Sequence, residues 1–394
     1  MSDSVQKKRI CVLSATRAEY GLLKPVIQKL MADPVFDVAV AVTGMHLSPK
    51  FGMTYKEIEN DGIPIDTKIE ILQDSDTPTA VSTAMGTAII RFAEYFADKT
   101  PDMLVVLGDR YETLAVCCAA TNQRIPIAHL YGGETTEGAV DEAYRHAITK
   151  MSYLHFTSTE EYRKRVIQLG EEPSRVFNVG ALGVENIKSM NLLSREELER
   201  TINWRLDKPY AVVTFHPVTL EQNSAGEQFQ NLLDVCSAHG ELKYIFTKAN
   251  ADADGAVINR MIDEYASSHE NAAAFASLGS LKYLSALKHC TFAAGNSSSG
   301  IVEAPSFGIP TVNIGDRQKG RIQAESIINC PPAYEGISAA FELALAYSHQ
   351  ENKILTANPY DGAKSSEKIV AVIKERLISG EINLKKKFWD VTYA

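Results

Sequence analysis

Short apolar runs of strand type alternate with helical patterns along the whole of this 394-residue chain. This alternation constrains the fold more than any other feature, because a helix between two strands carries the chain back across one face of the sheet and makes the strands parallel. We therefore expect an α/β protein with doubly wound parallel sheets. The expected strands are residues 9–13, 36–42, 68–72, 103–107, 125–130, 154–157 and 176–179 in the first half, and 210–215, 244–247, 273–276, 291–294 and 309–314 in the second.

The alternation stops at a polar stretch between residues 186 and 209 and then starts again. Within this stretch, Ser194 and the charged residues 195–200 predict a surface helix in a linker. We therefore expect two Rossmann-like domains of similar size, residues 1–187 and 188–375. A helix is expected at 365–378, and residues 376–394 form a tail that can cross back onto the first domain. We interpret the three lysines at 385–387 as a solvated charge run.

Composition excludes several classes of protein. A net charge of -9 argues against non-specific nucleic-acid binding, which depends on a basic surface. No apolar run reaches the roughly 18 residues of a membrane span, and residues 1–8 lead into no apolar export signal, so we expect no membrane contact and a cytoplasmic location. The six cysteines lack the spacings of metal sites and are expected to be reduced core residues. We expect neither a metal nor a cofactor.

A turn rich in glycine and serine, which includes Ser297 and Ser298, follows an expected strand and opens a helical pattern that contains Glu303. Small residues let a ligand approach the backbone, and the first turn of a helix presents unpaired N–H groups to an anion. The next strand leads into Arg317 and two further cations, at the edge where open α/β sheets bind ligands. These residues predict a phosphate site with Glu303 near a ribose. The alternative is an ordinary serine helix cap.

Arg17 and Arg110 also follow expected strands, at 9–13 and 103–107. An arginine at such a strand end suits a diphosphate, because its guanidinium donates two parallel hydrogen bonds. Asp109 beside Arg110 is a candidate acid or base, with Arg110 as the group that orients it. The alternatives are a surface arginine at position 17 and an aspartate at position 109 that only caps the following helix.

The strand at 125–130 leads into two glycines, which allow a tight turn that projects Glu134 toward the ligand edge. Asp141, Glu142 and Arg145 follow on an expected helix, and the carboxylates of this region can remove and return a proton. The alternative for Asp141 and Arg145 is a plain ion pair one helical turn apart. In contrast, we interpret Ser-Thr-Glu-Glu at 158–161 as a helix-capping box.

Three strand ends of the second half add polar candidates. His216 follows the strand at 210–215 and is expected to donate to a phosphate or transfer a proton, or else to be a satisfied turn histidine. Asn250 follows the next strand. Ser280 follows the third, where exposed backbone amides can recognise the edge of a base.

Taken in order, these motifs resemble the hydrolysing UDP-N-acetylglucosamine 2-epimerases of sialic-acid biosynthesis, over nearly the whole chain. The motifs are Ser-Ala-Thr-Arg-Ala-Glu-Tyr-Gly at 14–21, Val-Thr-Gly-Met-His at 42–46, Gly-Asp-Arg at 108–110, Gly-Gly-Glu at 132–134, Arg-His-Ala-Ile-Thr-Lys at 145–150, Phe-His-Pro-Val-Thr at 215–219, Gly-Asn-Ser-Ser-Ser-Gly at 295–300 and Ile-Gly-Asp-Arg-Gln-Lys-Gly-Arg at 314–321. The bacterial capsule-type members are the most similar, especially across residues 157–170. One departure is Tyr131, at a position where many relatives carry a glutamate.

The resemblance implies a GT-B fold of two Rossmann-like domains facing a cleft, and a UDP-sugar substrate whose nucleotide is bound mainly by the second domain. Carried over by motif, it implies Asp109, Glu134 and Asp141, together with Glu142 and His216, as the catalytic groups. It implies phosphate binding by Arg17, Ser297, Ser298 and Arg317, a ribose contact by Glu303, and places near the nucleotide for Asn250 and Ser280. Arg110 and Arg145 are further candidates for substrate binding. It also implies no cofactor, and a homo-oligomer that is either a dimer or a tetramer.

The implied reaction converts UDP-N-acetylglucosamine to UDP and free N-acetylmannosamine, by elimination to a glycal and hydration, and feeds the synthesis of sialic-acid-type sugars for capsules. The first alternative is the same chemistry on a UDP-linked diacetamido-trideoxyhexose or a GDP-linked analogue, in a legionaminic-type pathway. Tyr131 leaves this choice and the acid and base roles open: either Glu134 or Glu142 takes the role of the missing glutamate, or Tyr131 marks a branch with a different sugar. Lesser alternatives are a non-hydrolysing 2-epimerase, whose Ala-Gly-Leu-Arg-Thr run is absent here, a GT-B glycosyltransferase and a non-catalytic sensor of nucleotide sugars.

Overall fold

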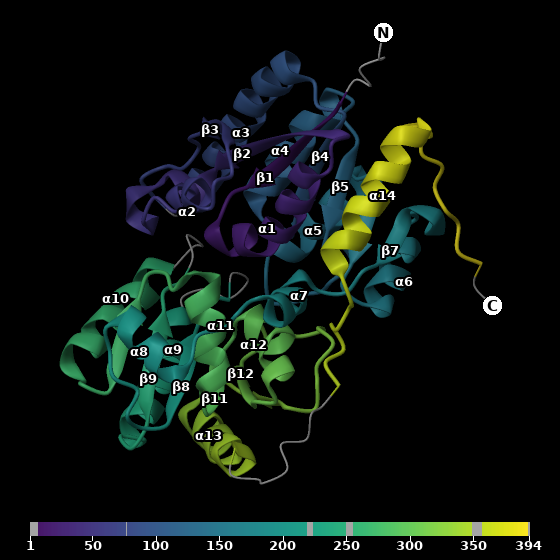
Figure 1. The fold of residues 1–394 in the computed structure, drawn as a ribbon. Helices are drawn as coiled ribbons and strands as arrows, with labels where there is room; N and C mark the ends of the chain where they lie inside the picture. The colour runs from purple at the N-terminus through teal and green to yellow at the C-terminus, as the bar shows by residue number, and fades with distance from the viewer. Residues whose placement is uncertain (1–6, 76, 219–223, 250–254, 349–356, 393–394) are drawn as a thin grey trace. The chain divides into compact units, whose positions relative to one another are not determined.

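The computed structural model describes residues 7–75, 77–218, 224–249, 255–348 and 357–392 of the chain (Figure 1). The chain forms two compact units. The first unit contains Met1–Glu134, Asp141–Asn186 and Gly362–Ala394, and the second contains Thr135–Val140 and Ile187–Asp361. Each unit is a parallel sheet with an apolar core on both faces, as the alternating sequence pattern predicts.

The sheet of the first unit has the strand order β3-β2-β1-β4-β5-β6-β7, and every neighbouring pair is parallel. Its strands are β1 (Lys8–Ser14), β2 (Phe36–Thr43), β3 (Ile65–Ile69), β4 (Met103–Leu107), β5 (Ile127–Leu130), β6 (Leu154–Thr157) and β7 (Val176–Asn178). Each corresponds to an expected strand, although β3 begins before its expected start at residue 68. The order reverses between β1 and β4, and ligands of doubly wound sheets bind at the carboxyl ends on either side of such a point.

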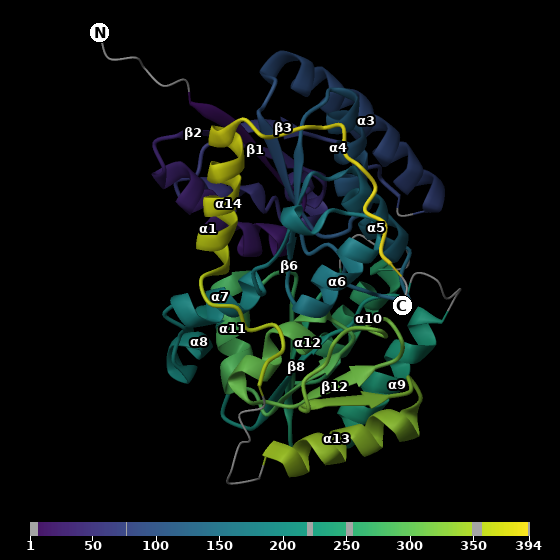
Figure 2. The ribbon, with the colours of Figure 1, turned by 90° about the vertical axis from the view of Figure 1, so that its right-hand side faces the viewer.

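Helices cover both faces of this sheet because successive strand residues point to opposite sides. In β1, Ile10 and Val12 face a core that includes α1 (Arg17–Ala32) and α14 (Ser365–Ser379), whereas Cys11 and Leu13 face the opposite core. Figures 1 and 2 both show α14, in yellow, beside α1. The opposite core contains α3 (Pro78–Lys99), α4 (Tyr111–Asn122) and α5 (Asp141–Met151). The unit also contains α2 (Tyr55–Asn60), α6 (Glu160–Gln168), the start of α7 (Leu182–Ser189), and the short turns η1 (Gly44–Leu47), η2 (Pro49–Phe51) and η3 (Pro173–Arg175).

The sheet of the second unit has the order β10-β9-β8-β11-β12-β13 and is also parallel. Its strands are β8 (Tyr210–Thr214), β9 (Lys243–Thr247), β10 (Ala272–Phe275), β11 (Phe292–Gly295), β12 (Thr311–Ile314) and β13 (Ile327–Cys330), and its helical segments are α8 (Arg195–Ile202), α9 (Ala225–Ala238), α10 (Gly255–Ser268), α11 (Gly279–His289), α12 (Ser298–Val302), η4 (Ala304–Phe307) and α13 (Tyr334–Ser348). The sequence did not predict β13, because this edge strand is short and mostly half-exposed. No helix among the described residues is long and apolar enough to cross a membrane.

The chain passes between the units more often than the sequence suggests. The expected second domain ends at residue 375, whereas the chain rejoins the first unit at Gly362. The reason is that Val370, Ile373 and Leu377 of α14 are buried in a core of the first unit. The segment Thr135–Val140 also belongs to the second unit.

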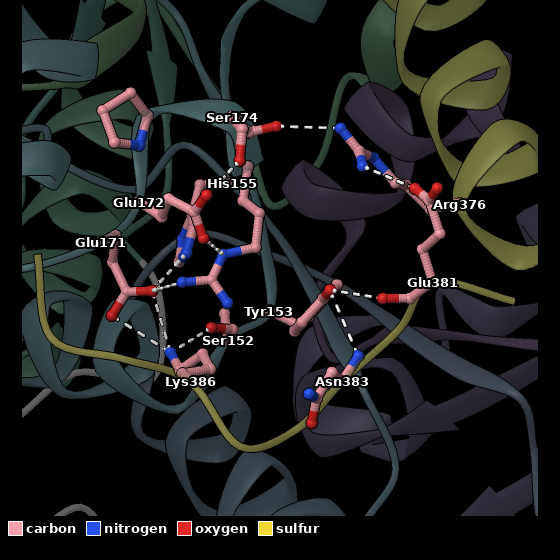
Figure 3. A network of polar contacts seen from close by, with 12 residues as sticks. Ser152, Tyr153, His155, Glu171, Glu172, Ser174, Arg376, Glu381, Asn383 and Lys386 are labelled. Atoms are coloured by element: carbon pink, nitrogen blue, oxygen red, sulfur yellow. Dashed lines mark hydrogen bonds and ion pairs between the residues drawn. The ribbon is translucent and has the colours of Figure 1, made fainter. Parts of the chain in front are cut away.

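A buried carboxylate joins the C-terminal tail to the first unit (Figure 3). Glu171 has no exposed side-chain surface and accepts from Lys150 Nζ at 2.7 Å, from Lys386 Nζ at 2.9 Å and from His155 Nε2 at 3.0 Å. Burial alone would raise the pKa of Glu171, but these hydrogen bonds outweigh it and lower the pKa to about 2. Lys386 is therefore an anchor of the tail, which corrects its interpretation as part of a solvated run.

We expect Lys386→Met to destabilise the protein by about 2 kcal/mol, because a buried carboxylate loses one charged donor while two others remain. Lys387→Met is the matched control, since Lys387 is exposed and carries the same charge. Urea unfolding of both variants measures the difference. Equal stability of the two variants would show that the tail is not anchored through Lys386.

Candidate active site

The fully buried guanidinium of Arg145 brings together the candidate residues of the first unit. Only 1% of Arg145 is exposed. Its Nη1 donates to the carbonyl of Glu134 at 3.0 Å and to Glu142 Oε2 at 2.7 Å, and its Nη2 pairs with the carboxylate of Asp109. These partners lie in the turn after β5, on α5 itself and in the turn after β4, respectively. Two candidate carboxylates and the backbone of a third candidate, Glu134, are thus gathered around one cation.

The amphipathic pattern of α5 explains why an arginine is buried there. Arg145, Ile148 and Thr149 form the buried face of this helix, at the spacing of one helical turn. A buried guanidinium is costly unless charged partners and hydrogen bonds compensate for lost hydration. Asp109 and Glu142 supply that compensation.

Glu134 is placed by a glycine turn that no larger residue could make. Gly133 has φ +78°, and a Cβ there would lie 2.4 Å from the carbonyl oxygen of Tyr162. Arg165 Nη1 donates to the Gly133 carbonyl at 2.6 Å. Glu134 is 4% exposed, and its Oε1 accepts from the hydroxyl of Ser158 at 2.7 Å. We had interpreted Ser158 as a helix cap, but Thr159 caps α6.

His129 fixes the turn that carries Asp109. Burial lowers the pKa of His129 to about 3, so the imidazole is neutral. Its Nε2 lies 2.7 Å from the Gly108 carbonyl, which can only accept, so Nε2 donates and Nδ1 accepts from Thr149 Oγ1 at 3.2 Å. The sequence gave no sign of this role, because His129 lies within the expected strand at 125–130.

Arg110 contacts a different acid from the one we expected. Its Nε and Nη2 donate to Glu112 at 3.1 and 3.2 Å, while Arg145 makes the contact with Asp109 that was expected of Arg110. Arg110 also occupies the N-cap position of α4. Asp109 is therefore not the capping residue of this helix.

Arg17 opens α1 directly after the β1 strand end. The helix is capped by Thr16, and Glu19 completes the capping box by accepting from the N–H groups of Ala15 and Thr16 at 2.8 and 3.3 Å. Burial raises the pKa of Glu19 to about 7, although the nearby charge of Arg110 opposes the shift. A buried carboxyl group that titrates near neutrality thus lies under the Arg17 turn.

Two further side chains of this unit show where sequence reasoning was incomplete. The hydroxyl oxygen of Tyr131 accepts from the N–H of Leu182 at 2.7 Å, at the start of α7. This contact gives Tyr131 a packing role. Glu142 Oε1 lies 3.1 Å from His146 Nε2, so the helix carries a carboxylate and histidine pair that the sequence analysis did not identify. Asp141, the first residue of α5, is half-buried.

In the second unit, the side chain of Asn296 holds the His216 turn. The His216 N–H donates to Asn296 Oδ1 at 2.7 Å, and Asn296 Nδ2 donates back to the His216 carbonyl at 2.8 Å. Gly295, with φ +122°, allows the two strand ends to approach, because a Cβ there would lie 2.0 Å from the Thr214 carbonyl oxygen. His216 is therefore fixed at the β8 strand end beside the serine turn.

The cation-rich stretch at 317–321 contacts the glycine- and serine-rich turn at 295–300 through the backbone of Asn296. Arg317 Nη1 and Gln318 Nε2 donate to the Asn296 carbonyl at 3.1 and 2.8 Å. Ser297 caps α12, whose first residue is Ser298, and Glu303 lies at the C-terminal end of this helix. Ser280 lies in the first turn of α11, and Asn250 falls outside the described residues.

Comparison with known proteins identifies the family. The family model described as UDP-N-acetylglucosamine 2-epimerase matches residues 28–374 of the chain. The chain belongs to the UDP-N-acetylglucosamine 2-epimerase family. Membership of this 2-epimerase family makes it an enzyme that acts on a sugar nucleotide.

Curated 2-epimerases and related proteins are similar over most of their length. The chain is 45% identical over 326 residues to the GDP/UDP-N,N'-diacetylbacillosamine 2-epimerase (hydrolyzing) of Campylobacter jejuni, covering 82% of this chain and 85% of that protein. It is 37% identical to the polysialic acid biosynthesis protein P7 of Escherichia coli, covering 98% of each. It is 34% identical to the UDP-N,N'-diacetylbacillosamine 2-epimerase (hydrolyzing) of Legionella pneumophila, covering 93% of this chain and 96% of that protein.

Solved structures of 2-epimerases share the fold. The UDP-N-acetylglucosamine 2-epimerase of Neisseria meningitidis, in a structure bound to UDP-N-acetylglucosamine, matches with a TM-score of 0.77 at 19% identity, covering 93% of this chain and 100% of that one. A structure from Listeria monocytogenes also matches with a TM-score of 0.77 at 19% identity, covering 97% and 99%. The expected GT-B-like fold, with two doubly wound parallel sheets, is confirmed.

The titration of Glu19 predicts how stability depends on pH. Its pKa of about 7 in the folded state lies above the ordinary value of 4.5, so the folded protein binds this proton more tightly than the unfolded chain. The resulting contribution to stability is complete below about pH 4.5 and is lost as the pH rises through about 7. Glu19→Gln stays neutral and keeps the capping contacts. When the pH rises from about 5 to about 8, its free energy of unfolding should therefore fall by about 2 kcal/mol less than that of the wild type.

Urea unfolding at the two pH values measures this difference. Glu161→Gln is the control, because Glu161 is an exposed residue in the first turn of α6. If Glu19→Gln and Glu161→Gln followed the same pH dependence, Glu19 would have to be ionised in the folded protein at neutral pH.

Proposed function

We propose that this enzyme is a hydrolysing 2-epimerase, which converts a nucleoside-diphosphate 2-acetamido sugar to the free 2-epimer and the nucleoside diphosphate. The observation that carries the proposal is the buried Arg145, which gathers Asp109, Glu142 and the Glu134 carbonyl at the strand ends of the first unit. A reaction that removes and returns a proton needs several acid and base groups in fixed positions. The hydrolysing relatives from Campylobacter and Legionella support the hydrolytic outcome.

The chemistry sets the order of events. The proton on C2 of an acetamido sugar is only weakly acidic until the bond from C1 to the diphosphate ionises. Departure of the diphosphate therefore leads or accompanies removal of this proton by a carboxylate. The product of elimination is a glycal. Water then adds its hydroxyl group to C1 while a proton is delivered to the opposite face of C2.

We assign proton transfer to the first unit and diphosphate binding mainly to the second. Cations and backbone N–H groups stabilise the charge that develops on a departing diphosphate. The proposed acid and base groups are Asp109, Glu134, Asp141 and Glu142, with His216 at the junction of sugar and phosphate. The proposed phosphate ligands are Arg17, Ser297, Ser298 and Arg317, with Glu303 on the ribose, and Arg110, Asn250 and Ser280 as further binding residues.

The relatives change the order of the two candidate sugars. The sequence motifs placed UDP-N-acetylglucosamine first, with N-acetylmannosamine as the product. The relatives at 45% and 34% identity are both named as 2-epimerases of diacetylbacillosamine, which is a diacetamido-trideoxyhexose. We therefore propose a UDP- or GDP-linked diacetamido-trideoxyhexose as the first substrate and UDP-N-acetylglucosamine as the second.

The test offers both sugar nucleotides in deuterated water and follows the sugar signals by NMR. We expect release of the nucleoside diphosphate together with a free 2-epimer that carries deuterium at C2, and faster turnover of the diacetamido sugar. Asp109→Asn should lower kcat by about a hundredfold or more, because proton-transferring groups contribute factors of this size. A 2-epimer still attached to the nucleotide would contradict the hydrolysing assignment.

Arg145→Lys tests the central cation. Lysine keeps the charge but loses the planar fork that binds several acceptors at once, so Asp109 and the Glu134 carbonyl cannot both be held. We expect kcat to fall by about a hundredfold, since small misplacements of reacting groups have effects of this size. Arg163→Lys, on α6, is the matched control and should leave kcat near the wild-type value. Similar kcat values for the two variants would remove Arg145 from its proposed role.

A further inference from the structure

Ser158 is buried where β6 ends, and its hydroxyl donates to Glu134 Oε1 at 2.7 Å. The two neighbouring threonines use their hydroxyls on the backbone. Thr157 Oγ1 donates to the carbonyl of Thr159 at 3.1 Å, and Thr159 Oγ1 accepts from the N–H of Tyr162 at 3.2 Å. The hydroxyls of Thr157 and Thr159 thus shape the start of α6, whereas the hydroxyl of Ser158 contacts the carboxylate.

The backbone of Glu134 is fixed independently of Ser158. Arg145 Nη1 donates to the Glu134 carbonyl at 3.0 Å, and Arg165 Nη1 donates to the preceding carbonyl of Gly133 at 2.6 Å. The Glu134 side chain itself adopts one of a few staggered rotamers. The hydrogen bond from Ser158 favours the rotamer seen in the structure.

Ser158 is itself held rigidly, because β6 is anchored on both sides. The N–H of Tyr131 donates to the Phe156 carbonyl at 2.8 Å. On the other side, His155 Nε2 lies 3.0 Å from Glu171 Oε2, within the network of Figure 3 that also anchors Lys386. A hydroxyl on so firmly held a strand end can define the position of a carboxylate oxygen.

We infer that Ser158 is a positioning residue, whose hydroxyl orients the Glu134 carboxylate to remove the proton from C2 of the substrate. This inference rests on the function proposed above. The hydroxyl donates and the carboxylate accepts, which is the arrangement that a base requires. Glu134 takes the C2 proton, the electron pair of the C2–H bond forms the C1–C2 double bond, and the C1–O electron pair leaves with the diphosphate.

A double-mutant cycle tests this inference, with Ser158→Ala, Glu134→Gln and the two changes together. We expect S158A to lower kcat by about tenfold to a hundredfold while KM changes by less than about twofold, because the carboxylate is misoriented and substrate binding is kept. S158A should cause no further loss in the E134Q background, because the hydroxyl acts through that carboxylate. Ser152→Ala is the matched control: Ser152 is buried, and its hydroxyl donates to the Ile148 carbonyl at 2.7 Å.

The possible outcomes separate the inference from the proposed function. If S158A or E134Q kept the wild-type kcat, the inference would be overturned and the proposed function would stand. The same would follow if S158A lowered kcat by the same factor in both backgrounds. If the wild type released no nucleoside diphosphate from either sugar nucleotide, both the inference and the proposed function would be overturned. Ser158→Cys keeps the volume and weakens the donor, so it serves as a second variant if S158A does not fold, and its kcat must also fall at unchanged KM.

Discussion

The guanidinium of Arg145 is the charge that the first unit must accommodate. It is almost fully buried, and a charge in that position is tolerated only when ionised partners and hydrogen bonds replace its hydration. The helix that carries Arg145 supplies one such partner, Glu142, and the others come from the turns after β4 and β5. The same contacts that stabilise the cation therefore hold Asp109 and the Glu134 backbone in place. Stabilisation of this cation and positioning of the candidate acid and base groups thus have one physical cause.

The second unit fixes its strand ends with a neutral side chain. Asn296 both donates to and accepts from the backbone of His216, and its own carbonyl accepts from Arg317 and Gln318. An amide can do this because it carries a donor and an acceptor on one rigid plane. The turn needs no buried carboxylate for its order, which fits the proposed binding of an anionic diphosphate there. A carboxylate at that position would repel such a ligand.

Sequence reasoning predicted the features that depend on local pattern and missed those that depend on distant partners. The strand positions followed from apolar runs, and both sheets were expected. The i,i+4 pattern suggested Asp141 as the partner of Arg145 on its own helix. The structure pairs Arg145 with Glu142 on that helix and also with Asp109, which lies 36 residues away in sequence. Ser158 matched a capping box because a glutamate follows it three residues later, and only the fold shows that Thr159 caps while Ser158 contacts Glu134. The sequence alone does not distinguish Lys386 from Lys387; the structure does, because Lys386 contacts the buried Glu171.

The contact of Tyr131 indicates what this residue does at a position where many relatives carry a glutamate. Many relatives carry a glutamate there, but in this chain the tyrosine oxygen accepts from the Leu182 N–H and the ring packs against the core of the first unit. We propose that another carboxylate near the same strand end transfers the proton in this chain. Asp109 and Glu142 are paired with the charge of Arg145, and the Glu134 carboxylate accepts from the hydroxyl of Ser158. A strong ion pair favours one protonation state, but a hydroxyl can donate or accept as the carboxylate gains or loses a proton. We therefore propose Glu134, whose carboxylate contacts a hydroxyl that can follow such a change, as the group that transfers the proton.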